Sequence, residues 1–176
     1  LWLGGRAAEV EAVCARAMDD QNVNVAPVFF LFHLALAQAE QGKGREALNS
    51  AEKAIAQAAA TDRLVVRLRR HMVLRVLGRW DEAVEYGNKL LEEFDTPEDR
   101  PAVRSAQAAA YWGAKKPDEA EKLLRAILDD DPDDAGACND LGYHLADQGR
   151  NLGEAERLIR HAVMVDRVER RKSGSA

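Results

Sequence analysis

The side chains that most often carry catalysis or hold metal ions are few in this sequence and lie far apart. They are four histidines and two cysteines: His33, His71, His144, His161, Cys14 and Cys138. None has the close spacing of a zinc-binding motif, and two cysteines are too few for a disulfide framework. We expect both cysteines to be small buried hydrophobic side chains. The sequence therefore predicts no catalytic residue, no metal site and no cofactor.

The carboxylates and the glycine-rich segments favour the same conclusion. Glu121 precedes Arg125 by four residues, and Glu156 precedes Arg160 by four. This is the spacing of ordinary ion pairs on a helix surface, which contribute tenths of a kcal/mol. The glycines at 4–5 and 42–44 do not follow a strand, as a phosphate-binding loop would. We predict that these residues do not form an enzyme, although a longer protein could carry a catalytic domain elsewhere.

Arginine is concentrated in one segment, residues 61–80 (TDRLVVRLRRHMVLRVLGRW). Either the arginines form a solvated basic face whose stems cover apolar surface, or they form a patch for an acidic partner, because guanidinium groups bind carboxylates bidentately. The candidates for such a patch are Arg67, Arg69, Arg70 and Arg75. Nucleic acid is not an expected partner, because no aromatic residues are interleaved with these arginines and the net charge is −5.

The composition is that of a folded helical protein. Of the 176 residues, 47% are hydrophobic and 31% are charged, which excludes a disordered chain. There are only five prolines, while alanine, leucine and glutamate are abundant, so helix is favoured throughout. The longest apolar run, residues 26–37, is shorter than the ~20 residues needed to cross a bilayer. We expect a soluble chain without membrane insertion, cytoplasmic rather than secreted.

A recurring Glu-Ala pair indicates how the helices are organised. The alanines of its four copies lie 36, 37 and 35 residues apart, at Ala47, Ala83, Ala120 and Ala155. Apolar or small residues follow four and seven positions after each alanine, which places them on one helix face. A degenerate copy at the front has Val10, Cys14 and Ala17 at this spacing. A period of this length is typical of two-helix repeats and excludes propellers and short leucine-rich repeats.

The last copy, residues 139–162 (NDLGYHLADQGRNLGEAERLIRHA), contains all the parts of the repeat. Gly149 ends the first helix, because glycine readily adopts positive φ, and Gly142, Ala155 and Ala162 are small enough for two helices to approach closely. With its Leu-Gly pair, turn glycine and two alanines, the segment resembles the tetratricopeptide repeat (TPR), with a turn one residue longer at 150–155. The resemblance implies an all-α, right-handed superhelical solenoid of antiparallel helix pairs, with four full repeats and a partial N-terminal one.

We expect helices near residues 5–19, 26–41, 45–59, 62–77, 80–94, 99–114, 117–130, 135–148 and 152–167. The sixth helix starts either at Pro97, capped by Thr96, or near Asp99. We favour Asp99, because Pro101 would otherwise interrupt a formed turn. Residues 1–167 are expected to form one TPR-like domain that begins inside a repeat, as an excerpt of a longer array, with 1–3 as the last turn of a preceding helix. Residues 168–176 are expected to be a flexible tail or tag.

The resemblance also implies a binding surface, because the first helix of each TPR pair lines the inner face of the array. The predicted partner-binding residues at such positions are Phe29, Phe32, Leu36, Arg69, Met72, Arg75, Trp112, Asn139 and Tyr143. Phe32 and Leu36 replace the lysine and asparagine that TPR clamps use for a terminal carboxylate, so binding of chaperone tails is not expected. The alternative is that Phe29 and Phe32 pack between helices as core.

Two functions are compatible with this pattern. The first is a protein-interaction scaffold that binds a protein or peptide segment, apolar or amphipathic with acidic residues, on its concave face. The second is an accessory or regulatory segment of a larger enzyme or of a secretion or assembly machine. Self-association through the ends of the repeat array is a further alternative, because a truncated array exposes apolar surface.

Overall fold

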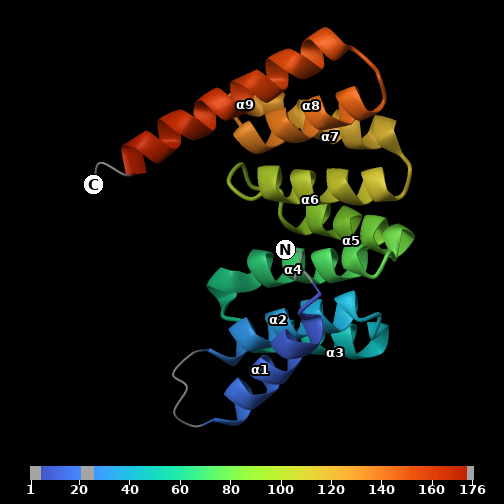
Figure 1. Cartoon of the computed structure of the whole chain (residues 1–176), viewed down its shortest axis with the longest axis vertical. Helices are drawn as coiled ribbons and strands as arrows, with labels where there is room; N and C mark the ends of the chain where they lie inside the picture. Colours follow the sequence, from blue (N-terminus) through green and yellow to red (C-terminus); the bar gives the residue numbers. More distant parts are fainter. Residues whose placement is uncertain (1–4, 21–25, 174–176) are drawn as a thin grey trace. The chain divides into compact units, whose positions relative to one another are not determined.

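The computed structural model describes residues 5–20 and 26–173, apart from the side chains of 169 and 171–173. Within these ranges every regular element is a helix, which confirms the predicted all-α class (Figure 1). In chain order the elements are α1 (Ala7–Asp19), α2 (Pro27–Glu40), α3 (Gly44–Gln57), the 3₁₀ turn η1 (Ala60–Asp62), α4 (Arg63–Val76), α5 (Trp80–Glu93), α6 (Arg100–Gly113), α7 (Pro117–Asp130), α8 (Ala135–Asp147) and α9 (Leu152–Ser173).

The start of α6 confirms the later of the two predicted positions. The helix begins at Arg100, with Asp99 as its N-cap residue and Pro101 in its first turn. A proline at this place loses no helical hydrogen bond, because the first N–H groups of a helix have no partner within it. The Thr96 side chain accepts a hydrogen bond from the Asp99 N–H at 3.2 Å, so Thr96 stabilises the preceding turn instead of capping the helix at Pro97.

The last helix is longer than the sequence predicted. We expected it to end near residue 167, whereas α9 continues to Ser173. Arginine, glutamate and lysine are good helix formers, and Asp166 pairs with Arg170 one turn later at 2.8 Å. The remainder of the predicted tail, 174–176, and the predicted helix end at 1–3 lie outside the described residues.

The contacts between helices divide the chain into two units, Leu1–Asp95 and Thr96–Ala176. In the first unit each helix packs on the next, from α1 to α5, and α4 also packs on α2. In the second unit α6 packs on α7, α7 on α8 and α8 on α9. The sequence showed no boundary inside the repeats, and the division falls just before Pro97, in the loop between α5 and α6.

The repeated alanines lie where the helices of each unit are closest. Ala47, Ala83 and Ala120 are completely buried, and Ala155 is nearly so. Most of the residues four and seven positions further on are buried as well: Ala51, Ala54, Gly87, Leu90, Leu124, Ile127 and Ala162. This confirms that the residues repeated with this period form the packed face of the second helix in each pair.

The closest helix approach occurs at Gly142 on α8. A Cβ atom at this position would lie 2.7 Å from Ile159 Cγ1 and 3.0 Å from the backbone oxygen of Ala155. Both distances are shorter than van der Waals contact. The prediction that small residues let α8 and α9 approach closely is therefore confirmed, and only glycine fits at this position without movement of α9.

The turns inside the four helix pairs share one backbone conformation. Gly42, Gly78 and Gly149 have φ values of 72°, 69° and 64°. In the third turn the same place is occupied by Lys115, with a φ of 59°, although side chains disfavour this left-handed region. The longer fourth turn accommodates its additional residue through a second positive φ, 44° at Asn151.

Candidate functional site

The predicted residues of α2 fall into two groups. Phe29 is 48% exposed, whereas Phe32 is only 5% and Leu36 only 2% exposed. The last two belong to the core cluster that joins α2, α3 and α4, together with Val73 of α4. The prediction that Phe32 and Leu36 are partner-binding residues is wrong, because they pack against α3 and α4, and the alternative interpretation as core holds for Phe32 but not for Phe29. Phe29, three residues earlier than Phe32, stays at the surface.

Phe29 is held by neighbouring rings on its own helix. Its ring lies 4.3 Å from that of His33 and 5.5 Å, edge to face, from that of Phe30, measured between centroids. His33 Nδ1 also lies 2.8 Å from the Phe29 backbone oxygen. Such ring contacts restrict the rotamers of Phe29 and favour a fixed aromatic surface at the N-terminal half of α2.

The arginines of α4 bind carboxylates of the neighbouring helices. Arg63 and Arg67 both pair with Glu93 of α5, at 2.7 and 3.1 Å, and Arg70 pairs with Glu52 of α3 at 2.5 Å. Arg67 and Arg70 are therefore not available as a patch for an acidic partner, because Glu93 and Glu52 of this chain already pair with them. Arg63 pairs with Glu93 while its side chain stays 58% exposed, as expected of a solvated residue.

Arg69 differs from its neighbours on α4. Its guanidinium carbon lies 4.1 Å from the centre of the Phe32 ring, in a cation–π contact. Among the described residues no carboxylate lies within ion-pair distance of Arg69. Met72 and Arg75 are half-buried, and Met72 packs against the core cluster that contains Phe32. Of the predicted basic residues, Arg69 therefore retains a positive charge without an acidic partner in the described chain.

In the second unit the aromatic residues of α6 and α8 form a continuous group. Trp112 is half-buried, packs against the core cluster of this unit and stacks on His144, with 3.7 Å between ring centroids and 24° between planes. Tyr143 contacts the same histidine edge to face, at 5.8 Å, and is 60% exposed. Asn139, one turn before Tyr143 on α8, is also exposed. Three of the predicted partner-binding residues, Trp112, Asn139 and Tyr143, therefore lie in the second unit.

His144 is the member of this group that the sequence prediction missed. Burial lowers its pKa, while the nearby carboxylates of Asp140 and Asp147 act in the opposite direction. Counting from the turn residues, the equivalent positions of the other first helices are Ala37, Val73 and Ala110, all completely buried. A histidine where the other repeats have fully buried small side chains is the signal that could have revealed it.

A shallow hollow lies beside Trp112 at the ends of α6 and α8. Its lining residues are Trp112, Lys115, Pro117, Asp147 and Gln148. The indole therefore has a surface that reaches solvent between a cationic and an anionic side chain. This hollow and the Phe29 surface belong to different units, and each is a candidate binding surface by itself.

Other kinds of site are not apparent in the described ranges. No group of three or more histidine, cysteine, aspartate or glutamate side chains there could hold a metal ion. Both cysteines are buried, as expected, and burial raises the pKa of the Cys14 and Cys138 thiols. None of the described helices combines the length and the apolar character needed to cross a bilayer.

No family model and no curated protein matches this sequence, but solved structures match its fold. PlcR of Bacillus thuringiensis, solved in complex with the peptide PapR7 and DNA, has a TM-score of 0.69 at 11% identity, over 97% of this chain and 67% of its own. The TPR-like repeats of a putative Podospora anserina kinesin light chain give 0.60 at 19%, over 94% and 87%. MamA of Desulfovibrio magneticus RS-1 gives 0.53 at 15%, over 96% and 98%.

The fold is TPR-like. Identities this low establish the architecture and not a function, since repeat folds of this kind serve many partners. In the TPR-like frame α2, α4, α6 and α8 are the first helices of their pairs, and α3, α5, α7 and α9 are the second. Phe29, Asn139 and Tyr143 are therefore exposed residues of first helices, while Phe32 and Leu36 are core residues of a first helix.

Proposed function

We propose that this TPR-like chain is a protein-interaction scaffold whose partner docks on the exposed aromatic side chains of its first helices. One observation carries the proposal: Phe29 and Tyr143, two large aromatic side chains on first helices, are 48% and 60% exposed. Contiguous exposed apolar surface commonly marks interaction sites, and each of these two rings contacts further aromatic side chains of its own unit.

The rigidity of these aromatic residues supports the same proposal. Tyr143 contacts His144, which stacks on Trp112, and Trp112 packs against the core cluster. An anchor held in its bound rotamer loses little entropy on association, so more of its contact energy contributes to affinity. Tyrosine and tryptophan are also enriched among the residues that dominate binding energy. Within the second unit we place the anchor at Tyr143, with Trp112 and Asn139 beside it.

The charges around each surface suggest the chemistry of the partner. In the first unit Arg69, whose guanidinium lies over the Phe32 ring, favours an apolar segment that also carries acidic residues. In the second unit Asp147 lies in the hollow beside Trp112, so we assign to that surface an apolar residue flanked by a basic one. PlcR, a structural neighbour, was solved with a bound peptide, which supports a peptide as the kind of ligand. We propose no enzymatic activity for these residues.

The test is a selection of peptides from a random display library on the intact chain, followed by titration of the selected peptides. We expect Tyr143→Ala or Phe29→Ala to weaken binding by about 30-fold, which corresponds to about 2 kcal/mol for one buried aromatic anchor. Val13→Ala, in an equally exposed apolar residue of α1, is the matched control and should leave the affinity unchanged. The proposal would be refuted if no peptide were enriched, or if both aromatic variants bound the selected peptides as tightly as the native chain does.

A further inference from the structure

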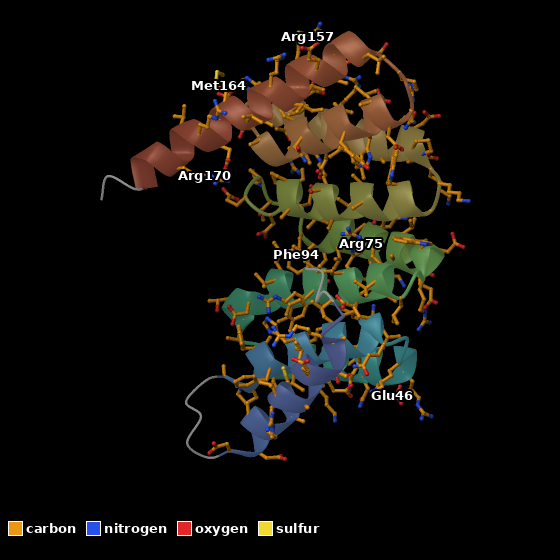
Figure 2. The ribbon with its side chains drawn as sticks, viewed as in Figure 1. Glu46, Arg75, Phe94, Arg157, Met164 and Arg170 are labelled. Carbon is orange, nitrogen blue, oxygen red and sulfur yellow. The ribbon has the colours of Figure 1, made fainter. Side chains whose placement is uncertain are left out.

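The last helix carries an apolar surface of its own, apart from the first helices. Two adjoining hollows along α9 share Ile159 and Arg160 in their linings. Together they form what we call the α9 groove, with an apolar floor of Ala146, Leu152, Ile159 and Val163 and a charged rim of Glu156, Arg160 and Arg167. Leu152 is 60% and Val163 is 47% exposed. Figure 2 shows Met164, also exposed, on the side of α9 that points away from α8.

The same groove exists in the first unit, where a helix fills it. Ala39 precedes its turn glycine by three residues, as Ala146 does, yet Ala39 is buried because α4 packs on α2 and α3. Gly44 precedes the repeat alanine by three residues, as Leu152 does, and a Cβ on Gly44 would meet the Leu77 side chain at 3.8 Å. The positions exposed at the α9 groove are thus positions that receive the next helix.

The second unit supports the same comparison. Val163 follows its repeat alanine by eight residues, and the equivalent residue of α7 is Leu128. Leu128 is partly buried against the core cluster to which α8 contributes Ala137 and Leu141. Val163 therefore occupies a place that a helix covers in the preceding repeat, while no helix of the described chain covers it in α9.

The charge at the rim indicates which helix would fit. Glu52 follows the repeat alanine of α3 by five residues and pairs at 2.5 Å with Arg70 of the inserted α4. Arg160 stands five residues after the repeat alanine of α9. This position therefore carries a positive charge in α9, where α3 carries the negative charge of Glu52. Among the described side chains Arg160 pairs with Glu156 of its own helix, and no carboxylate lies within ion-pair distance of Arg167. An inserted helix should accordingly carry negative charge where α4 carries Arg70.

We propose that the α9 groove docks an acidic amphipathic helix of a partner protein. The occupant would lie along α9 as α4 lies against α2 and α3, with apolar residues on Ala146, Ile159 and Val163 and glutamate or aspartate facing Arg160 and Arg167. A helix as long as α4, with 14 residues, spans about 21 Å. This surface is separate from the exposed aromatics of the first helices, so the two proposals succeed or fail independently.

The experiment uses the intact chain and two labelled peptides of α4 length, each held helical by a side-chain lactam, because short isolated helices are marginal in water. Both carry the same alanine and leucine stripe, and the polar face bears glutamates in one and lysines in the other. Fluorescence polarisation should show binding of the glutamate peptide at least 10-fold tighter than of the lysine peptide. The double variant Arg160→Glu with Arg167→Glu should reverse this preference.

A second variant separates docking from folding. Val163→Asp should abolish binding of the glutamate peptide, whereas Val13→Asp, at a similarly exposed residue of α1, should not, and circular dichroism should show both folded. Equal binding of the two peptides, or binding of neither, overturns the proposal. In that case sedimentation with vesicles containing phosphatidylglycerol would reveal a lipid surface as the occupant. Light scattering would reveal a second copy, if Val163→Asp removes a concentration-dependent dimer.

Discussion

The close approach of α8 and α9 gives a quantitative prediction for Gly142→Ala. The added Cβ would lie 2.7 Å from Ile159 Cγ1 and 3.0 Å from the Ala155 backbone oxygen. Favourable non-bonded contacts are about 3.5–4.0 Å, so the α9 backbone at Ala155 must move outward by about 0.5–1 Å. The Ile159 side chain could turn away, but the Ala155 oxygen belongs to the helix backbone and cannot.

Two opposing effects determine the size of the change. Inserting one methyl group into a packed interface costs about 1–3 kcal/mol, and alanine gains about 1 kcal/mol over glycine in a helix interior. Because the backbone of α9 must shift, we expect the upper part of the first range and a net loss of about 1–2 kcal/mol. Gly153→Ala is the matched control, since a Cβ there meets only Arg157 Nη1 at 3.8 Å, and it should be neutral or stabilising.

Urea unfolding followed by circular dichroism measures both changes. A double-mutant cycle tests the cause, because Ile159→Ala removes the nearer of the two atoms. In the Ile159→Ala background the cost of Gly142→Ala should shrink by at least about 0.5 kcal/mol. A Gly142→Ala protein as stable as the native one, or a cost independent of Ile159, would show that the helices are not packed as closely as described.

Three further predictions concern the turns, the core and an ion pair. Lys115→Gly should raise stability by about 0.5–1 kcal/mol, measured by urea unfolding, because the left-handed φ of 59° strains a lysine and not a glycine; an unchanged midpoint would argue against that strain. Phe32→Ala should cost about 3–5 kcal/mol, as for a packed phenylalanine, while Phe29→Ala should cost under about 1 kcal/mol; equal costs would mean that both side chains are buried alike. Hydrogen bonds from Arg125 hold the pKa of Glu154 below its ordinary 4.5, so this carboxylate stabilises the fold above pH 4.5 and the contribution is lost as pH falls through the lower folded pKa. The stability difference between the native protein and Glu154→Gln should therefore shrink on acidification, and a difference independent of pH would contradict the pairing.

The sequence predicts the helices and their packing well, because both depend on a period. A position that must be small in one repeat is small in the others, as at Ala47, Ala83 and Ala120, and the turn needs a residue that accepts positive φ. These constraints are local, and each is repeated, so a few irregular copies do not hide them. The exception at Lys115 shows that a strained residue is accepted where the surrounding turn is already fixed.

The candidate site was predicted less well, for a physical reason. The segment PVFFLFHLALAQAE of α2 has apolar residues on every face, so its sequence cannot indicate that α4 covers Phe32 and Leu36 but not Phe29. Arg70 and Glu52 are 18 residues apart in the sequence. Their pairing therefore cannot be predicted from the three- and four-residue spacings of a single helix. Whether an arginine on α4 is free for a partner depends on the neighbouring helices, which only the folded chain specifies.

The most direct test of the proposed scaffold function is photo-crosslinking at Tyr143. Separate chains would carry benzoylphenylalanine in place of Tyr143, of Phe29, or of Val13 as a control, and each would be irradiated with a peptide selected on the native protein. The proposal predicts that some selected peptides crosslink at residue 143 with no adduct at residue 13, because Tyr143 is an anchor of the partner surface. Crosslinking at residue 13 alone, or at neither residue 143 nor residue 29 for any selected peptide, would contradict it.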